Sequence, residues 1–221
     1  MPVIRSLFAV SAITLGAAWG VEAQRPVQDN VLISTELPSA RIAFDSTLTY
    51  VGAQSVVLFG HTDAEQHFFV DADESRIRRL VWVQFEGKRP HNPSTYDYSR
   101  YPVMDIGGHP LYHDGRFFEI KIDEERPGSD FRHALEYLRE HGYNLGPEVM
   151  RQRLVWLLDE PARNELMIIY YEDLRDHGLS IADLEPGGKA AERWDEISNG
   201  LLKRAVEALT FSDVPVTQAA P

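Results

Sequence analysis

The residues best suited to bind a ligand are gathered in one stretch of the chain, residues 87–115. This stretch has four prolines and no clear strand or helix period, but its tyrosines and aliphatic residues give it enough apolar surface to pack. Seven basic and four acidic residues lie between Arg76 and Arg116, which gives this segment a charge of +3 and leaves −15 on the remainder. Guanidinium groups beside tyrosine rings bind carboxylates and other anions through bidentate hydrogen bonds and stacking. We therefore expect an ordered loop that covers a ligand site. The alternatives are a loop that only closes the sheet, and arginines that only neutralise an acidic surface.

Two strands beside this loop supply further candidates. Along residues 80–86, alternation places Leu80, Trp82, Gln84 and Glu86 on one face. Along residues 116–122, one face mixes Phe117, Glu119 and Lys121. Such mixed faces either line a cavity with a few polar groups or meet water. Glu86 and Glu119 would form an acid–base pair only as neighbours in a dry cleft, where the pKa of one would rise. The predicted ligand-binding residues are Arg89, Tyr96, Tyr98, Arg100, Trp82, Glu86 and Glu119.

Histidines form a second candidate site. Five of the eight lie between His61 and His113, and His109, His113 and Asp114 fall within six residues. Imidazoles and carboxylates are ligands of zinc, which needs several of them to converge. Pro110 prevents one unbroken helix from carrying both histidines, which excludes the helical metalloprotease spacing. A divalent metal such as zinc at His109, His113 and Asp114 remains a hypothesis, and solvated or core histidines are the alternative. Further ligands would come from His61, Asp63, His67 or His91.

The composition excludes several classes of function. The chain has 221 residues, a net charge of −12 and no cysteine, so disulfides, thiol nucleophiles and cysteine-ligated metals are excluded. The acidic balance argues against nucleic acid as a partner and against binding to anionic membranes. Nucleophile-elbow, Walker, dinucleotide-binding and EF-hand motifs are absent from the sequence. No cofactor and no catalytic residue is therefore predicted from a motif.

The N-terminal residues have the pattern of an export signal. Arg5 supplies a positive charge, residues 7–18 form an uncharged apolar run, and residues 21–23 offer the small residues that a signal peptidase reads. The run is shorter than the about 20 residues that span a bilayer, so no stable membrane span is expected after cleavage. We predict a signal peptide over residues 1–23, cleavage before Gln24, and a periplasmic or secreted location.

The rest of the chain is predicted to form one domain. Residues 24–40 are interpreted as an N-terminal extension, residues 41–211 as the domain and residues 212–221 as a flexible tail. Short β-branched and aromatic runs, separated by turns too short for crossover helices, predict an antiparallel meander. These runs are residues 41–44, 55–59, 66–71, 77–85 and 116–122.

Two helices and a hairpin complete the expected fold. A helical apolar stripe over residues 129–141, with Ser129 placed to cap and Gly142 to terminate, predicts a mid-chain helix. A second stripe over residues 188–209 predicts a long C-terminal amphipathic helix. Apolar runs at residues 154–158 and 166–171 predict a hairpin, although a helix from Pro147 remains an alternative for the first run. The expected fold is α+β, a mostly antiparallel sheet of about six or seven strands with both helices packed on one face.

Three functions are compatible with these observations. The first is an exported protein that binds a small amphipathic or anionic molecule under residues 87–115. The second is a metal-assisted hydrolase that uses His109, His113 and Asp114. The third is an envelope module that binds another protein through a sheet edge or loop. The absence of catalytic motifs favours the first.

Overall fold

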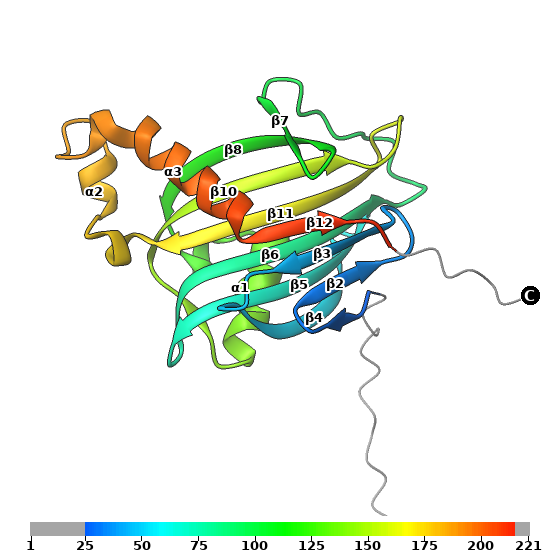
Figure 1. Ribbon diagram of the computed structural model, residues 1–221, viewed down its shortest axis with the longest axis horizontal. Coiled ribbons are helices and arrows are strands. Elements are labelled where there is room, and N and C mark those ends of the chain that lie inside the picture. Colours follow the sequence, from blue (N-terminus) through cyan, green and yellow to red (C-terminus); the bar gives the residue numbers. More distant parts are fainter. Residues whose placement is uncertain (1–24, 215–221) are drawn as a thin grey trace, which may run out of the picture.

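Two antiparallel sheets face each other in the computed structural model, which describes residues 25–214 (Figure 1). The small sheet has the order β1-β2-β3-β12, and the large sheet has the order β4-β5-β6-β11-β10-β8-β7. A two-residue strand, β9 (Asn144–Leu145), pairs in parallel with the start of β6. The strands of the small sheet are β1 (Val27–Gln28), β2 (Val31–Ser34), β3 (Ala40–Phe44) and β12 (Leu209–Ser212). Those of the large sheet are β4 (Thr49–Leu58), β5 (Thr62–Asp73), β6 (Arg76–Lys88), β7 (Val103–Ile106), β8 (His109–Glu119), β10 (Glu148–Leu157) and β11 (Asn164–Asp173).

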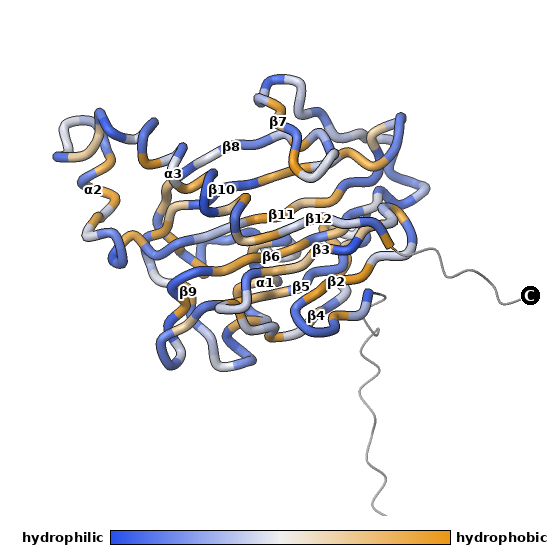
Figure 2. The backbone as a smooth tube through the Cα atoms, in the orientation of Figure 1, coloured by the Kyte–Doolittle hydropathy of each residue, from blue (hydrophilic) through white to orange (hydrophobic). Residues whose placement is uncertain are grey.

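The large sheet is buried on both faces because its central strands carry apolar side chains in both directions. Val81 and Val83 of β6 belong to a core shared with the small sheet and α3, whereas Leu80 and Trp82 belong to a second core shared with α1. The alternation predicted for residues 80–86 is therefore confirmed. Figure 2 shows apolar stretches along the sheet strands and hydrophilic residues at many of the turns. We call the two surfaces of the large sheet the small-sheet face and the α1 face.

The helices cover opposite faces of the large sheet. Helix α1 (Asp130–Glu140) begins at Ser129, whose hydroxyl accepts a hydrogen bond from the Arg132 amide at 3.3 Å, as the sequence predicted. Helix α3 (Trp194–Glu207) crosses the other face beside the small sheet, and Leu201 and Ala205 are buried there (Figure 1). The remaining helical segments are α2 (Ile181–Leu184) and 3₁₀ turns at Ile122–Glu124, Leu174–His177 and Ala191–Arg193.

The α+β class with mostly antiparallel strands is confirmed, but the arrangement differs from the expected single sheet. Residues 27–34, interpreted as an extension, form β1 and β2, and the C-terminal β12 pairs with β3 to close the small sheet. The two main helices lie on different faces because both faces of the large sheet are apolar. Strands β10 and β11 pair as a hairpin, so the helical alternative from Pro147 is wrong.

Some sequence predictions change at their boundaries or lie outside the described residues. The stretch 87–115 contains β7 and the start of β8, so its irregular part is residues 89–102. The C-terminal helix begins at Trp194, which is half-buried and packs edge-on against Phe117 at 4.8 Å between ring centroids. The predicted signal peptide (1–23) and residues 215–221 of the predicted tail lie outside the described range. Between residues 25 and 214, no helix has the length and apolarity of a membrane span.

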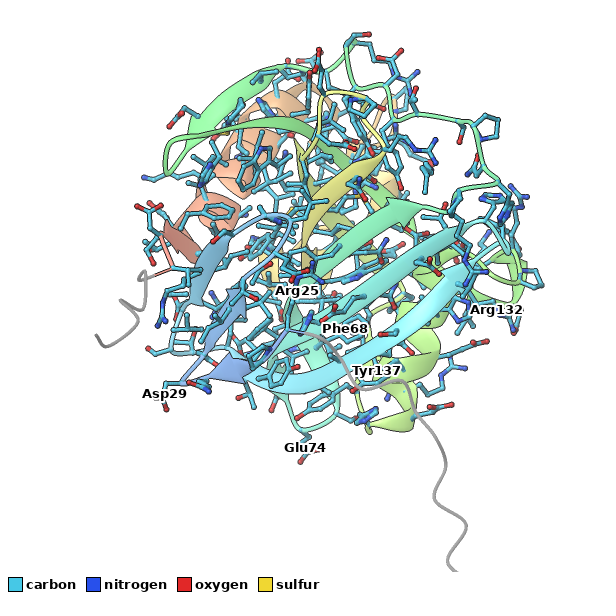
Figure 3. The ribbon with its side chains drawn as sticks, turned by 90° about the vertical axis from the view of Figure 1, so that its right-hand side faces the viewer. Arg25, Asp29, Phe68, Glu74, Arg132 and Tyr137 are labelled. Carbon is cyan, nitrogen blue, oxygen red and sulfur yellow. The ribbon has the colours of Figure 1, made fainter. Side chains whose placement is uncertain are left out.

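Helix α1 docks on β4 where the strand has an irregular register at Gly52. The φ angle of Gly52 is +146°, and a Cβ placed there would collide with the hydroxyl of Tyr137, whose ring stacks on Phe68 at 4.9 Å (Figure 3). We expect Gly52→Ala to lower the free energy of unfolding by about 2–4 kcal/mol, because it adds both backbone strain and a steric clash. Equilibrium urea denaturation measures this loss.

Gly60 provides the control, because it has a φ of +81° but open space around a new Cβ. Gly60→Ala should therefore cost only the backbone term, about 1 kcal/mol. In a Tyr137→Phe background, Gly52→Ala should cost less than in the native chain. An unchanged cost in that background would show that the close approach of Tyr137 is not what requires glycine.

Candidate functional site

A cavity of about 460 Å³ opens at one end of the large sheet, on the small-sheet face. The ends of β4, β5, β6 and β11 form its floor, and the N-terminal segment forms one wall. Glu86 and Glu165 border it through their backbone, because alternation turns their side chains to the α1 face. The side chains that line it include Leu37, Val57, Phe85 and Leu158, together with Arg25, Asp63, Glu65 and Arg89.

A hydrogen-bonded chain fixes the polar wall of this cavity. Arg25 donates from Nη1 to Glu65 Oε2 at 2.7 Å, and its guanidinium lies over the ring of Phe85 at 3.9 Å. Glu65 Oε1 lies 2.8 Å from Nε2 of the fully buried His67, whose Nδ1 lies 3.2 Å from the Tyr50 hydroxyl. Burial alone would raise the pKa of Glu65, but the hydrogen bonds from His67 and Arg25 hold it below its usual value. Burial raises the pKa of Tyr50 to about 12, so its hydroxyl stays protonated at neutral pH.

The rim of the cavity carries a second ion pair. Arg89 follows β6 and contacts Asp63 of β5 at 2.8 Å. The side chain of Asp63 is 63% exposed, so this pair is screened by water and can rearrange when a ligand enters. Arg89 is thus the one residue of the predicted ligand set whose side chain lines the cavity.

On the α1 face, behind the cavity floor, two carboxyl groups are buried side by side. Glu86 of β6 and Glu165 of β11 are direct partners in the strand register. Glu86 accepts hydrogen bonds from the Tyr96 hydroxyl at 2.6 Å and from the Gln84 amide. Glu165 is 1% exposed, and its Oε2 has no hydrogen-bond partner in the described part of the chain.

The raised pKa values of the pair favour retention of one proton at neutral pH. Burial and then the charge of Glu86 raise the pKa of Glu165 to about 8, and burial raises that of Glu86 as well. Both oxygens of Glu86 accept hydrogen bonds, which favours its ionised form, so we assign the proton to Glu165. Tyr96 and Tyr98 of residues 89–102 lie beside the pair: the Tyr96 hydroxyl donates to Glu86, and burial together with the charge of Glu165 raises the pKa of Tyr98. Glu165 is therefore closed to solvent in this conformation, whereas Glu86 is only partly buried.

The structure brings four of the predicted ligand residues to the α1 face: Trp82, Glu86, Tyr96 and Tyr98. Arg100 is exposed, and its guanidinium lies 5.0 Å from the ring of Tyr101. Glu119 lies on the small-sheet face, half-exposed and paired with Lys121 at 3.1 Å, so it is not the partner of Glu86. That partner is Glu165, which the sequence analysis missed because strand register between β6 and β11 was not predicted.

The three candidate metal ligands do not converge. His109 stacks on Trp156 with ring centroids 4.0 Å apart, and His113 shares its face of β8. Asp114 points to the opposite face, where it accepts hydrogen bonds from Arg151 and Arg153. Within residues 25–214, no group of three histidine or acidic side chains is arranged to hold a metal ion.

The carboxyl pair makes folding stability depend on pH. The pKa of Glu165 is about 8 in the folded chain and has an ordinary value of 4.5, so between these values the folded state holds a proton that the unfolded state releases. The free energy of unfolding should fall as pH rises through this window, by up to about 1.4 kcal/mol per pH unit. Glu165→Gln cannot ionise, so it should flatten this decline and be the more stable protein at pH 8. Urea denaturation at pH 5, 6.5 and 8 measures both effects.

Glu119→Gln is the matched control, because its half-exposed side chain should leave the profile of the native chain unchanged. If Glu165→Gln keeps the native slope, the pair does not retain a proton in the folded state.

Comparisons with known proteins identify no relative of this chain. No protein-family model matches the chain, and neither a curated protein nor a solved structure is significantly similar to it. Inference about function therefore rests on the geometry of the cavity, the carboxyl pair and their surroundings.

Proposed function

We propose that this protein is an exported binding protein for a small amphipathic molecule that occupies the cavity beside Arg25, Glu65 and Arg89. The observation that carries the proposal is the cavity itself, which measures about 460 Å³ and lies in a fold with no catalytic motif. Ligand pockets in proteins commonly measure about 300–1,000 Å³ and combine apolar walls with a few fixed polar groups. This cavity has both features.

The charges of the wall narrow the class of ligand. Arg25 pairs with Glu65 and Arg89 pairs with Asp63, so these four charges sum to zero. A charged ligand that separated Arg25 from Glu65 would leave one of these two desolvated charges without a partner. A neutral or zwitterionic molecule, mostly apolar and with a few hydrogen-bonding groups, therefore fits better than a strongly charged one. Leu37 and Val57, which are 47% and 40% exposed, offer apolar contact at the entrance.

The metal-assisted hydrolase and the protein-binding module lack a supporting observation among the described residues. The residues of the metal-assisted hydrolase lie on different faces of β8, and no observation favours a particular protein partner. The pair of Glu86 and Glu165 has the chemistry of an acid–base couple, but Glu165 is fully buried and Glu86 is held by the Tyr96 hydroxyl.

Filling the cavity should abolish binding without unfolding the protein. We expect Val57→Trp to reduce the affinity for the neutral fluorescent probe N-phenyl-1-naphthylamine at least tenfold, because the indole would occupy the entrance. Val103→Trp is the matched control, since Val103 is 52% exposed on β7 and does not line the cavity. Fluorescence titration and melting temperature are measured for both variants. Equal probe binding by the two variants would contradict the placement of the site.

A copurified ligand provides an independent check. Native mass spectrometry of protein isolated from its own source should show a bound small molecule for the native chain and for Val103→Trp, but not for Val57→Trp. A ligand retained equally by all three proteins would place the binding site elsewhere.

The export part of the proposal has its own test. Intact mass spectrometry of protein expressed in a bacterium should show a periplasmic or secreted chain that begins at Gln24. A chain lacking residues 2–23 should remain in the cytoplasm. Recovery of the full-length chain from the cytoplasm alone would contradict export while leaving the cavity proposal intact.

A further inference from the structure

Three arginines share one carboxylate on the α1 face of β8 and β10. Asp114 accepts hydrogen bonds from Arg151 Nη2 at 2.6 Å and from Arg153 Nε at 2.7 Å. The Nε of Arg116 lies 3.3 Å from the same carboxylate. We call Asp114, Arg116, Arg151 and Arg153 the basic cluster. It carries a net charge of +2 within a chain whose net charge is −12.

The basic cluster is largely removed from water. The exposed fractions of the side chains are 15% for Arg151, 19% for Arg153 and 10% for Asp114. Two desolvated guanidinium groups with one shared counter-ion repel each other, and this costs free energy unless a further negative charge is present. Asp130 lies within Coulomb range of both Arg151 and Arg153, Glu165 lies within range of Arg153, and burial raises the pKa of both carboxyl groups. Asp114 is thus the one carboxylate in the described part of the chain that accepts hydrogen bonds from Arg151 and Arg153.

Its hydrogen-bond donors are also incompletely used. The Nε of Arg151 is buried and has no acceptor among residues 25–214. Arg153 donates only through Nε, so its terminal nitrogens have no acceptor in the same part of the chain. The rings of Tyr98 and Tyr101 lie 5.3 and 5.4 Å from the Arg153 guanidinium and hold its plane in place. Arg116, with 59% of its side chain exposed, leaves the cluster open on one side.

From this geometry we infer a second binding site, for a doubly charged oxyanion group such as phosphate, formed by Arg116, Arg151 and Arg153. Two negative charges balance the net +2, and the oxygen atoms supply acceptors for the unused guanidinium donors. The site lies on the α1 face, so it is separate from the cavity of the proposed function. Asp114 fixes the three guanidinium groups in position and does not touch the anion.

Inorganic phosphate is the probe, titrated calorimetrically into the full protein at pH 7 and constant ionic strength. The native chain should bind with a saturable heat. Arg153→Gln should weaken binding roughly ten- to a hundredfold, because it removes charge-assisted hydrogen bonds. Arg116→Gln should weaken binding several-fold, and because Arg116 is exposed this variant should keep the native melting temperature.

Arg193→Gln is the control for net charge alone. Arg193 is 61% exposed and pairs with Glu196, away from the basic cluster, and its replacement changes the net charge by the same amount. Its affinity for phosphate should match that of the native chain. The inference is overturned if the native chain gives no saturable heat, or if all three variants lose affinity equally. If Arg153→Gln does not fold, the comparison of Arg116→Gln with Arg193→Gln decides the question.

Discussion

The burial of β6 and β11 on both faces is the constraint on which the rest of the structure depends. Val81, Val83 and Ile168 point to one side and Trp82 and Ile169 to the other, so neither face can be left to water. The chain supplies two different covers. The small sheet and α3 cover one face, and α1 with residues 89–102 covers the other. The cavity lies at the end of the large sheet where the first cover is incomplete.

Polar residues within these doubly buried strands must find partners inside the protein. A chain of side-chain amides solves this on the α1 face, where Gln54 donates to Gln66 at 2.7 Å and the sequence of donors continues to Glu86. On the small-sheet face, Glu65, His67 and Tyr50 satisfy one another. The amide chain ends on Glu86, with further bonds from Gln54 and Gln66 to backbone oxygens of α1, and this favours the ionised form of Glu86 and the protonated form of Glu165. The pH dependence of stability is thus a consequence of strand pairing and amide orientation.

The sequence was sufficient to predict local structure but not long-range pairing. Alternation in residues 80–86 and the cap at Ser129 depend on neighbouring residues, and both were predicted correctly. The partner of Glu86 depends on β6 pairing with β11, about 80 residues later, and nothing local specifies that register. The same limit explains why the sequence offered Glu119 as a candidate partner of Glu86. The sequence indicated a face of mixed polarity in β6 and another in β8. Whether these two faces lie on the same side of the sheet depends on β11 and β10, which lie between β6 and β8.

The two covers of the large sheet differ in how completely they satisfy polar atoms, and this difference bears on function. Within the described residues, four buried side-chain atoms lack hydrogen-bond partners: Trp82 Nε1, Arg151 Nε, Gln152 Nε2 and Glu165 Oε2. Alternation places three of them on the α1 face and only Gln152 on the other.

Most buried polar groups in folded proteins are paired, and unpaired groups concentrate at sites where function tolerates the cost in stability. The α1 face therefore combines unpaired donors, a carboxyl group whose pKa is raised by burial and an excess of arginine, which are features that a bound polar group would satisfy. On the small-sheet face the buried charges have partners, both at the wall of the cavity and at Glu172, which pairs with Arg204 of α3. These contrasting environments favour different chemistry on the two faces, with an apolar or neutral molecule in the cavity and an anion at the basic cluster.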